Sequence, residues 1–123
     1  MNIISTPLYI STTRRCNLSC EYCHLPKDKR DSYICDEGKL LYTVNRLVRE
    51  IELNDIVYQT VVLHGAECTT LSIETLSLLC NKLSRIALIV SLQSNMLKFA
   101  DLEYTLDFYN KLDDPTYISI GAS

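Results

Sequence analysis

The sequence predicts an α/β domain in which β-strands and α-helices alternate and the strands form a parallel sheet. Short apolar runs rich in β-branched residues alternate with segments in which apolar residues recur at helical spacing. The later predicted strands begin near residues 58, 86 and 116, and intervals of about 28–30 residues match the length of one strand-helix unit. We therefore expect about four parallel β-α repeats.

The first half of the chain supplies two strands and one helix. Residues 8–12 read as a short strand, and residues 58–63 read as a strand that is covered on both faces. Between them, Asp36 is a suitable N-cap for an amphipathic helix. The apolar face of that helix is predicted to comprise Leu40, Leu41, Val44, Leu47, Val48 and Ile51.

The second half repeats the pattern. A helix is expected after Thr70, a third buried strand over residues 86–92, and a fourth strand over residues 117–120. The apolar stripe of the first of these helices is Ile73, Leu76, Leu79, Cys80 and Leu83, which makes Cys80 a core residue. A weaker helical pattern before the last strand runs through Phe99, Leu102, Leu106 and Tyr109.

Composition sets the class of protein. The chain has 123 residues, 47% of them apolar, and a formal net charge of -3, which fits one globular domain over residues 1–123. The acidic balance argues against a general nucleic-acid or anionic-membrane binder, since phosphate affinity needs clustered Lys and Arg. The amino terminus does not resemble a secretory signal, and no apolar run reaches the roughly 18 residues of a membrane helix. We expect a cytoplasmic protein that acts on neither nucleic acid nor membrane.

The strongest chemical signal is a C-x3-C-x2-C run formed by Cys16, Cys20 and Cys23. It lies in the long irregular stretch 13–35, and an irregular segment of that length is typically functional. Three closely spaced thiolates suit a 4Fe-4S cluster that keeps one iron open for a ligand. The alternative is a structural zinc site completed by His24 or Cys35, although this spacing lacks the two pairs of ordinary zinc sites.

These residues resemble the radical S-adenosylmethionine superfamily, whose signature is this cysteine run with an aromatic residue, here Tyr22, before the last cysteine. The resemblance implies that Cys16, Cys20 and Cys23 hold a 4Fe-4S cluster and that Tyr22 lies near the adenine of S-adenosylmethionine. It also implies a partial TIM-like (β/α)6 barrel, of which this chain would supply about four units. The implied activity is that of an oxidoreductase that reductively cleaves S-adenosylmethionine to a deoxyadenosyl radical, which abstracts a hydrogen atom.

Three later segments extend the resemblance. Gly65-Ala66-Glu67 is similar to a Gly-Gly-Glu motif that binds the amino group of the cofactor, with Ala66 in place of the second glycine. Gln93 and Asn95 resemble cofactor or substrate contacts of peptide-modifying members, which are similar to anaerobic sulfatase-maturating enzymes. Ser119 matches a ribose-contacting serine in a motif where Gly121 replaces an acidic residue.

Residue chemistry leaves alternatives open in the same segments. Glu67 taken alone reads as a solvated loop carboxylate, and Ser119 reads equally well as a buried strand residue bonded to backbone. Cys68 would face the site as a redox thiol or serve as a plain loop thiol. The four polar loops are expected at one rim, because the carboxyl ends of parallel strands lie together.

The resemblance implies a peptide or protein substrate and an electron donor such as flavodoxin or ferredoxin. Four predicted strands are fewer than the six of the family, so the domain reads as truncated, and whether it is itself an enzyme stays open. The alternative function is a non-catalytic cluster-binding half-barrel or the partner subunit of a split radical enzyme. An apolar fourth strand at an open edge further predicts a second copy or a partner subunit that covers it.

Overall fold

A computed structural model describes residues 2–12, 37–65 and 67–122 of the chain. Within these ranges, parallel strands alternate with helices, which confirms the predicted α/β class with its parallel sheet. The elements in chain order are β1 (Asn2–Ile4), β2 (Leu8–Ser11), α2 (Glu37–Leu53), β3 (Ile56–His64), the short 3-10 helix η1 (Cys68–Thr70), α3 (Ile73–Leu83), β4 (Ala87–Ser94), α4 (Leu102–Asn110), the short 3-10 helix η2 (Pro115–Tyr117) and β5 (Ile118–Ala122).

The strands form a five-stranded sheet in which neighbours in space follow the order of the chain. Strands β1 and β2 both pair with β3, and they lie end to end along its same edge, because Tyr58 pairs with Ile4 on one side and with Ala87 of β4 on the other. Strand β5 then pairs with β4. The predicted strands are all present, whereas β1 was not anticipated, since three residues carry too little pattern and it depends on pairing with β3.

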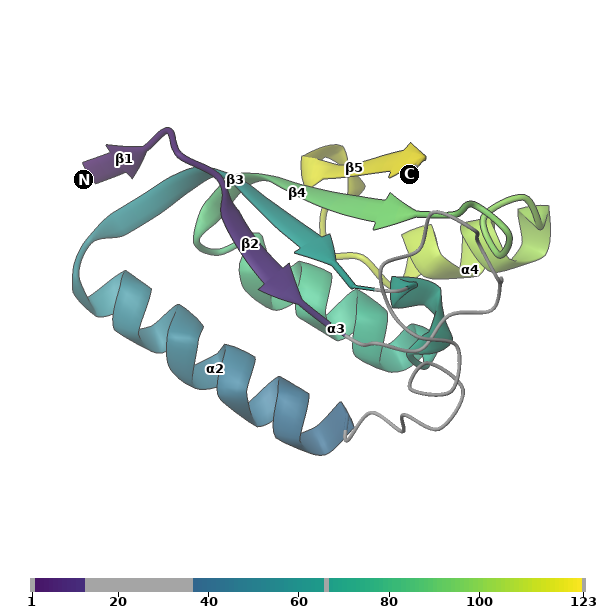
Figure 1. Cartoon of the computed structure of the whole chain (residues 1–123), viewed down its shortest axis with the longest axis horizontal. Coiled ribbons are helices and arrows are strands. Elements are labelled where there is room, and N and C mark those ends of the chain that lie inside the picture. Colours follow the sequence, from purple (N-terminus) through teal and green to yellow (C-terminus); the bar gives the residue numbers. More distant parts are fainter. Residues whose placement is uncertain (1, 13–36, 66, 123) are drawn as a thin grey trace.

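One face of the sheet carries the helices. Right-handed crossovers between strands in sequential order place successive helices on the same side, and Figure 1 shows α2 and α3 together below the sheet. A single apolar core joins residues of α2, α3 and α4 to the facing strand residues. None of the helices in the described ranges is long and apolar enough to cross a bilayer.

Register divides the strand residues between two faces. Two rows across the sheet lie in the core or pack against it, namely Leu8, Val61, Val90 and Ile118, and Ile10, Leu63, Leu92 and Ile120. The row between them, Tyr9, Val62, Ser91 and Ser119, lies on the opposite side. This row and its neighbours Ser11, His64, Gln93 and Gly121 form what we call the open face, which no described helix covers.

The predicted apolar face of α4 is partly wrong: Phe99 is buried and Tyr109 packs against the core as expected, but the two leucines do not. Leu102 and Leu106 are 71% and 54% exposed, while Phe108 is fully buried and packs edge to face against Phe99. The weak periodicity in the sequence followed the leucines, but the larger aromatic ring buries more apolar area and so sets the rotation of the helix. In α2, Leu47 is likewise 37% exposed, and the predicted core residues Val44, Val48 and Ile51 are buried.

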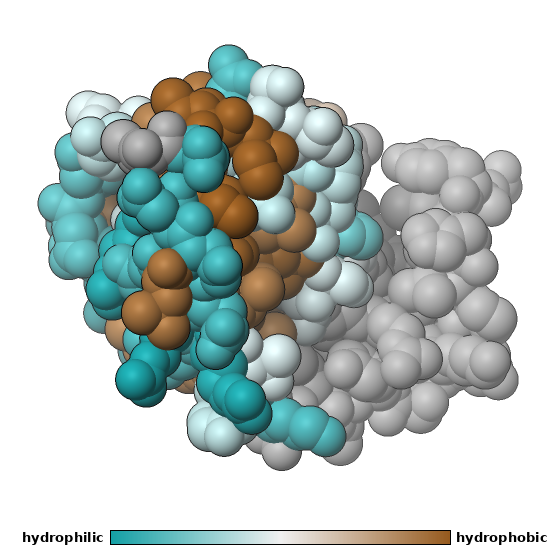
Figure 2. Space-filling model, turned by 90° about the vertical axis from the view of Figure 1, so that its left-hand side faces the viewer, coloured by the Kyte–Doolittle hydropathy of each residue, from teal (hydrophilic) through white to brown (hydrophobic). Residues whose placement is uncertain are grey.

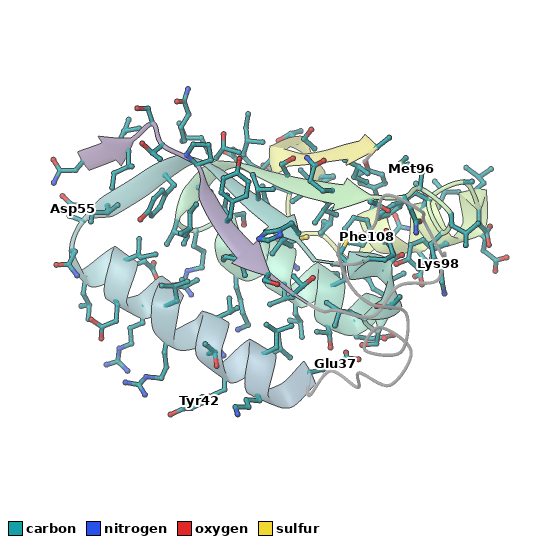
Figure 3. All side chains as sticks on the ribbon, in the orientation of Figure 1. Glu37, Tyr42, Asp55, Met96, Lys98 and Phe108 are labelled. Carbon is teal, nitrogen blue, oxygen red and sulfur yellow. The ribbon has the colours of Figure 1, made fainter. Side chains whose placement is uncertain are left out.

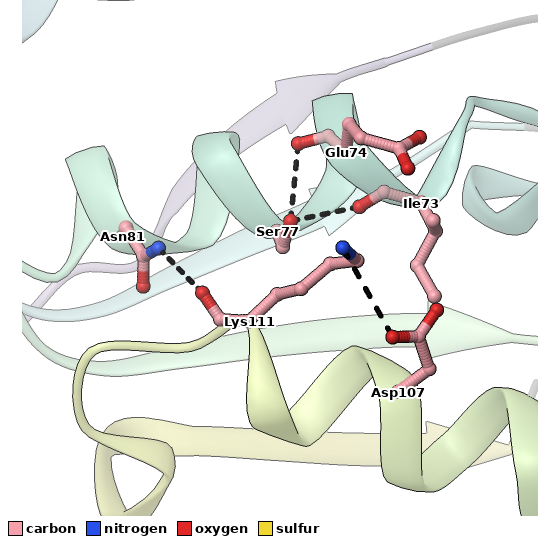
Figure 4. Close-up of polar contacts among 6 residues, drawn as sticks. All are labelled: Ile73, Glu74, Ser77, Asn81, Asp107 and Lys111. Atoms are coloured by element: carbon pink, nitrogen blue, oxygen red, sulfur yellow. Dashed lines mark hydrogen bonds and ion pairs between the residues drawn. The ribbon is translucent and has the colours of Figure 1, made fainter.

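Side-chain contacts attach the end of α4 to α3 (Figure 4). The amide of Asn81 donates to the carbonyl oxygen of Lys111 at 3.1 Å and accepts from the backbone N–H of Asp113 at 2.9 Å. Lys111 also lies 4.0 Å from Asp107 one turn earlier. The paired amide therefore satisfies backbone groups that the end of a helix leaves without partners.

The rotation of α4 can be tested by shortening one buried and one exposed side chain on the same helix. Phe108→Ala should lower the free energy of unfolding by about 3–5 kcal/mol, because it leaves a cavity in the core. Leu106→Ala, the matched control, should change it by less than about 0.5 kcal/mol. Urea denaturation followed by circular dichroism measures both, and a larger loss for Leu106→Ala would contradict the observed orientation.

Candidate functional site

The candidate site lies at the end of the sheet where Ser11, His64, Ser94 and Ala122 close their strands, which we call the rim. Parallel pairing brings these four strand ends to the same side of the molecule. In Figure 3, Met96, just beyond β4, lies at the end opposite Asp55, which precedes β3. The strand ends that precede the predicted polar loops therefore lie together at the rim, as expected from the sequence.

The segment that holds the cysteine motif lies outside the described residues, and so do Cys16, Cys20, Tyr22 and Cys23. The residue before that segment, Thr12, is held at the rim, since its N–H and its hydroxyl both donate to the carbonyl oxygen of His64, at 2.8 and 3.0 Å. Chemistry at the motif itself therefore stays a prediction, but the chain enters that segment beside the strand end that precedes Gly65.

The residue that follows the same segment is also held beside the rim. The Glu37 carboxylate accepts from the hydroxyl of Ser72 at 2.7 Å and from its N–H at 3.3 Å. Burial alone would raise the pKa of Glu37, but hydrogen bonds from Thr75 and Ser72 outweigh it and lower the pKa. Because Ser72 caps α3, this contact joins the starts of two helices at the rim.

Glu67 is the buried polar centre of the rim. Its side chain is 1% exposed, and four donors face it. One carboxylate oxygen accepts from the N–H of Asn95 at 2.7 Å, and the other accepts from the Ser94 hydroxyl at 2.8 Å and from both the N–H, at 3.2 Å, and the hydroxyl of Thr69. An ionised carboxylate suits four donors, because it can only accept.

These contacts change the interpretation of the Gly65-Ala66-Glu67 segment. The solvated loop carboxylate considered for Glu67 is wrong, because the group is buried and bonded within the protein. Gly65 has a φ of 148°, a backbone conformation that strains residues with a side chain, which explains the glycine. Ala66 lies outside the described residues. Pairing of Glu67 with the amine of a bound cofactor stays a prediction.

A tight turn after β4 completes the polar network. Ser94 is 1% exposed, and its hydroxyl accepts from the N–H of Met96 at 3.0 Å. The Asn95 side chain accepts from the N–H of Leu97 at 3.0 Å. Met96 adopts a φ of 68°, which is uncommon for a residue with a long side chain. Asn95 is thus held at the rim by its backbone bond to Glu67 and by its own side chain.

Gln93 and Ser119 lie on the open face near the rim. Register places Gln93 beside Gly121, and Ser119 beside Ser91. The Gln93 amide donates weakly to the Ser91 hydroxyl at 3.4 Å, and a Cβ at position 121 would lie 3.3 Å from that amide nitrogen. Glycine at 121 therefore gives the Gln93 amide its space. Ser119 is exposed, so the alternative of a buried strand serine is wrong.

Cys68 and Cys80 are the two cysteines among the described residues. Both thiols are fully buried, which confirms Cys80 as a core residue and contradicts the expectation that Cys68 faces the site. Burial, followed by the nearby Glu67 charge, raises the pKa of Cys68 to about 12. A thiol with so high a pKa is a poor nucleophile at neutral pH.

Sequence reasoning missed three residues of the network. Thr12, Thr69 and Ser94 are buried and supply hydroxyl groups to the rim. The available signal was a hydroxyl residue near each predicted strand end, because Thr12 and Ser94 close the first and third predicted strands and Thr69 lies two residues after Glu67. The partners of Thr12 and Ser94 are distant in sequence, by 52 and 27 residues, so no local pattern revealed these two contacts, whereas Thr69 bonds to Glu67 only two residues away.

Whether the rim fits S-adenosylmethionine can be judged from the chemistry of its groups. The exposed hydroxyl of Ser119 and the amide of Gln93 suit the hydroxyl and amino-acid groups of such a ligand. The Glu67 carboxylate is already fully bonded. Among residues 2–12, 37–65 and 67–122, no group of three His, Cys, Asp or Glu side chains could hold a metal ion. Any cluster therefore depends on the cysteine motif.

Replacing one oxygen of the buried carboxylate tests the network. Glu67→Gln should lower the free energy of unfolding by about 1–3 kcal/mol, because its NH2 group faces donors and loses an acceptor. Glu50→Gln changes an exposed carboxylate of α2 and is the matched control, expected within about 0.5 kcal/mol of wild type. Equal stability of the two variants by urea denaturation would refute the network.

The raised pKa of Cys68 predicts a loss of stability at alkaline pH. In the unfolded chain the thiol ionises near its ordinary pKa of 9.0, while in the folded chain it keeps its proton to about pH 12. Its contribution is therefore complete below pH 9.0 and declines as the pH rises toward 12. Urea midpoints between pH 8 and 10 should fall less steeply for Cys68→Ala than for wild type, and identical slopes would contradict the burial of this thiol.

Comparison with known proteins assigns no family to the chain. No protein-family model matches it, and a search of curated proteins finds no match either. What the site does is therefore a proposal that rests on the cysteine motif, on the Glu67 network and on the position of the rim.

Proposed function

We propose that the chain is a radical S-adenosylmethionine core that binds a 4Fe-4S cluster and S-adenosylmethionine. The observation that carries the proposal is the anchoring of the chain on both sides of the cysteine motif. Thr12 is bonded to His64, and Glu37 is bonded to Ser72, so both anchors lie at the rim. The Glu67 network and the turn after β4 lie at that same end of the sheet.

The fold proposed for this function is part of a TIM-like barrel. Three features support it: all strand pairs are parallel, their order follows the chain, and the helices cover one face. A doubly wound sheet would instead carry helices on both faces. In a barrel the open face would turn inward, and the rim would be the end at which such folds place their active sites.

Three of the described residues, Glu67, Gln93 and Ser119, have a proposed role. The Glu67 carboxylate fixes the loop after β3 to the end of β4, so that its backbone can meet the amino-acid part of the cofactor. Gln93 and Ser119 would offer hydrogen bonds to the cofactor or the substrate from the open face. When bound, the cluster and S-adenosylmethionine supply a deoxyadenosyl radical for hydrogen abstraction, and a peptide is the proposed substrate.

Anaerobic reconstitution with iron and sulfide tests the proposal. The reduced protein should show the electron paramagnetic resonance signal of a 4Fe-4S cluster, and adding S-adenosylmethionine should change that signal, because it would bind the open iron. Cys20→Ala should abolish both effects. Cys35→Ala removes a cysteine outside the motif and is the control that should keep both.

The outcome also separates the other functions. Formation of deoxyadenosine under a strong reductant identifies an enzyme, whereas a signal change without deoxyadenosine identifies a non-catalytic cofactor-binding module. Zinc in place of iron by metal analysis would identify the structural site that uses His24 or Cys35. A cluster that does not respond to S-adenosylmethionine would refute the cofactor.

A further inference from the structure

Both edges of the sheet lack charged side chains, one of the features that protect exposed strands from pairing with another chain. On one edge β1 and β2 pair only with β3, and on the other β5 pairs only with β4, as far as the described residues extend. Exposed edges normally carry charged side chains that prevent pairing with another chain. Residues 2–12 and 115–122 contain no Asp, Glu, Lys or Arg, although 22% of the chain is charged.

Large apolar side chains are exposed at the same edges. Tyr9 and Ile3 on the first edge are 63% and 60% exposed, and Tyr117 beside the second is 44% exposed. Figure 2 views the end at which the strands begin, and hydrophobic residues gather in the upper middle of that face, while its lower part is mostly hydrophilic. Exposed apolar surface gathered in one region is typical of an interface.

The open face is also uncharged. Two residues of each strand contribute to this face, and none of them is Asp, Glu, Lys or Arg. They are Tyr9, Ser11, Val62, His64, Ser91, Gln93, Ser119 and Gly121. Burying such a face against another protein removes no carboxylate, ammonium or guanidinium group from water, which avoids the largest desolvation costs. Charged residues are placed instead on the helices, as at Arg46 and Arg49 of α2.

We propose that two copies of the chain pair edge to edge, with β5 of each beside β2 of the other, and close into one parallel barrel. The five strands of a copy occupy four positions, because β1 and β2 share an edge. Two copies related by a two-fold axis along the barrel supply eight positions, a number that closes a barrel filled by side chains. Both junctions are equivalent, so the assembly stops at two copies.

A second copy is favoured over an unrelated partner because the chain itself offers both halves of the junction. Strands β2 and β5 point in the same direction within one sheet, so β5 of one copy can pair in parallel with β2 of the other. Neither strand carries a charge, so no electrostatic repulsion opposes the pairing. Closure also completes the candidate site, since the open faces of the two copies would enclose Gln93 and Ser119 from both sides. The pairing needs no cluster, and its test is therefore independent of the proposed function.

Lysine substitutions at each edge test the pairing in the full chain without cofactor. Wild type should sediment as a dimer at micromolar concentration. Tyr9→Lys and Tyr117→Lys should each weaken the dimer by about tenfold or more, because each puts a charge into both junctions. Tyr42→Lys on the outer side of α2 is the matched control, since Tyr42 and Tyr9 are both 63% exposed, and it should leave the dissociation constant within about twofold.

The contradicting results are distinct from a failure to fold. All three tyrosines are exposed, and unchanged thermal unfolding by circular dichroism of the variants would show that the monomer is intact. A monomeric wild type would overturn the proposal. Sensitivity to lysine at only one edge would also overturn it, because like-with-like pairing of β5 or of β2 uses a single edge. An equal effect of Tyr42→Lys would place the interface on the helices instead.

Discussion

The hydrogen bonds of Glu67 are the interaction on which the rim depends. Glu67 is the only buried charged side chain among the described residues, and its carboxylate joins the loop after β3 to the end of β4 and to Thr69. A buried charge is costly unless donors replace the water that it loses. The four donors meet that requirement only when both strand ends are in place, so the charge couples the geometry of the two loops.

Strand order makes this coupling possible. Because successive strands pair in parallel, Ser11, His64 and Ser94 end side by side, and the segments that leave them begin at one place. Thr12 and Glu37 hold the chain on either side of the cysteine motif to that same end. Hydrogen bonds at the strand ends therefore bring residues from four distant parts of the sequence into one site.

The sequence pattern predicted those elements whose burial repeats regularly along the chain. The strands at Val61–Leu63 and Val90–Leu92 and the buried face of α3 followed from it, because burial repeats regularly along an element. It could not predict the rotation of α4, where Leu102 and Phe108 compete, nor the burial of Glu67. Both depend on partners far along the chain. The cysteine motif was found by its spacing alone, and its chemistry stays a prediction.

The distribution of charge separates the surfaces that the chain exposes from those that it buries. The single buried carboxylate is matched by four donors within one chain, whereas both edges and the open face carry no ionised Asp, Glu, Lys or Arg. A monomer gains nothing from uncharged edges and risks uncontrolled strand pairing. The proposed second copy would cover these edges and would also shield the open face beside the rim. If the proposed barrel forms, the site and the open face would be parts of one interior.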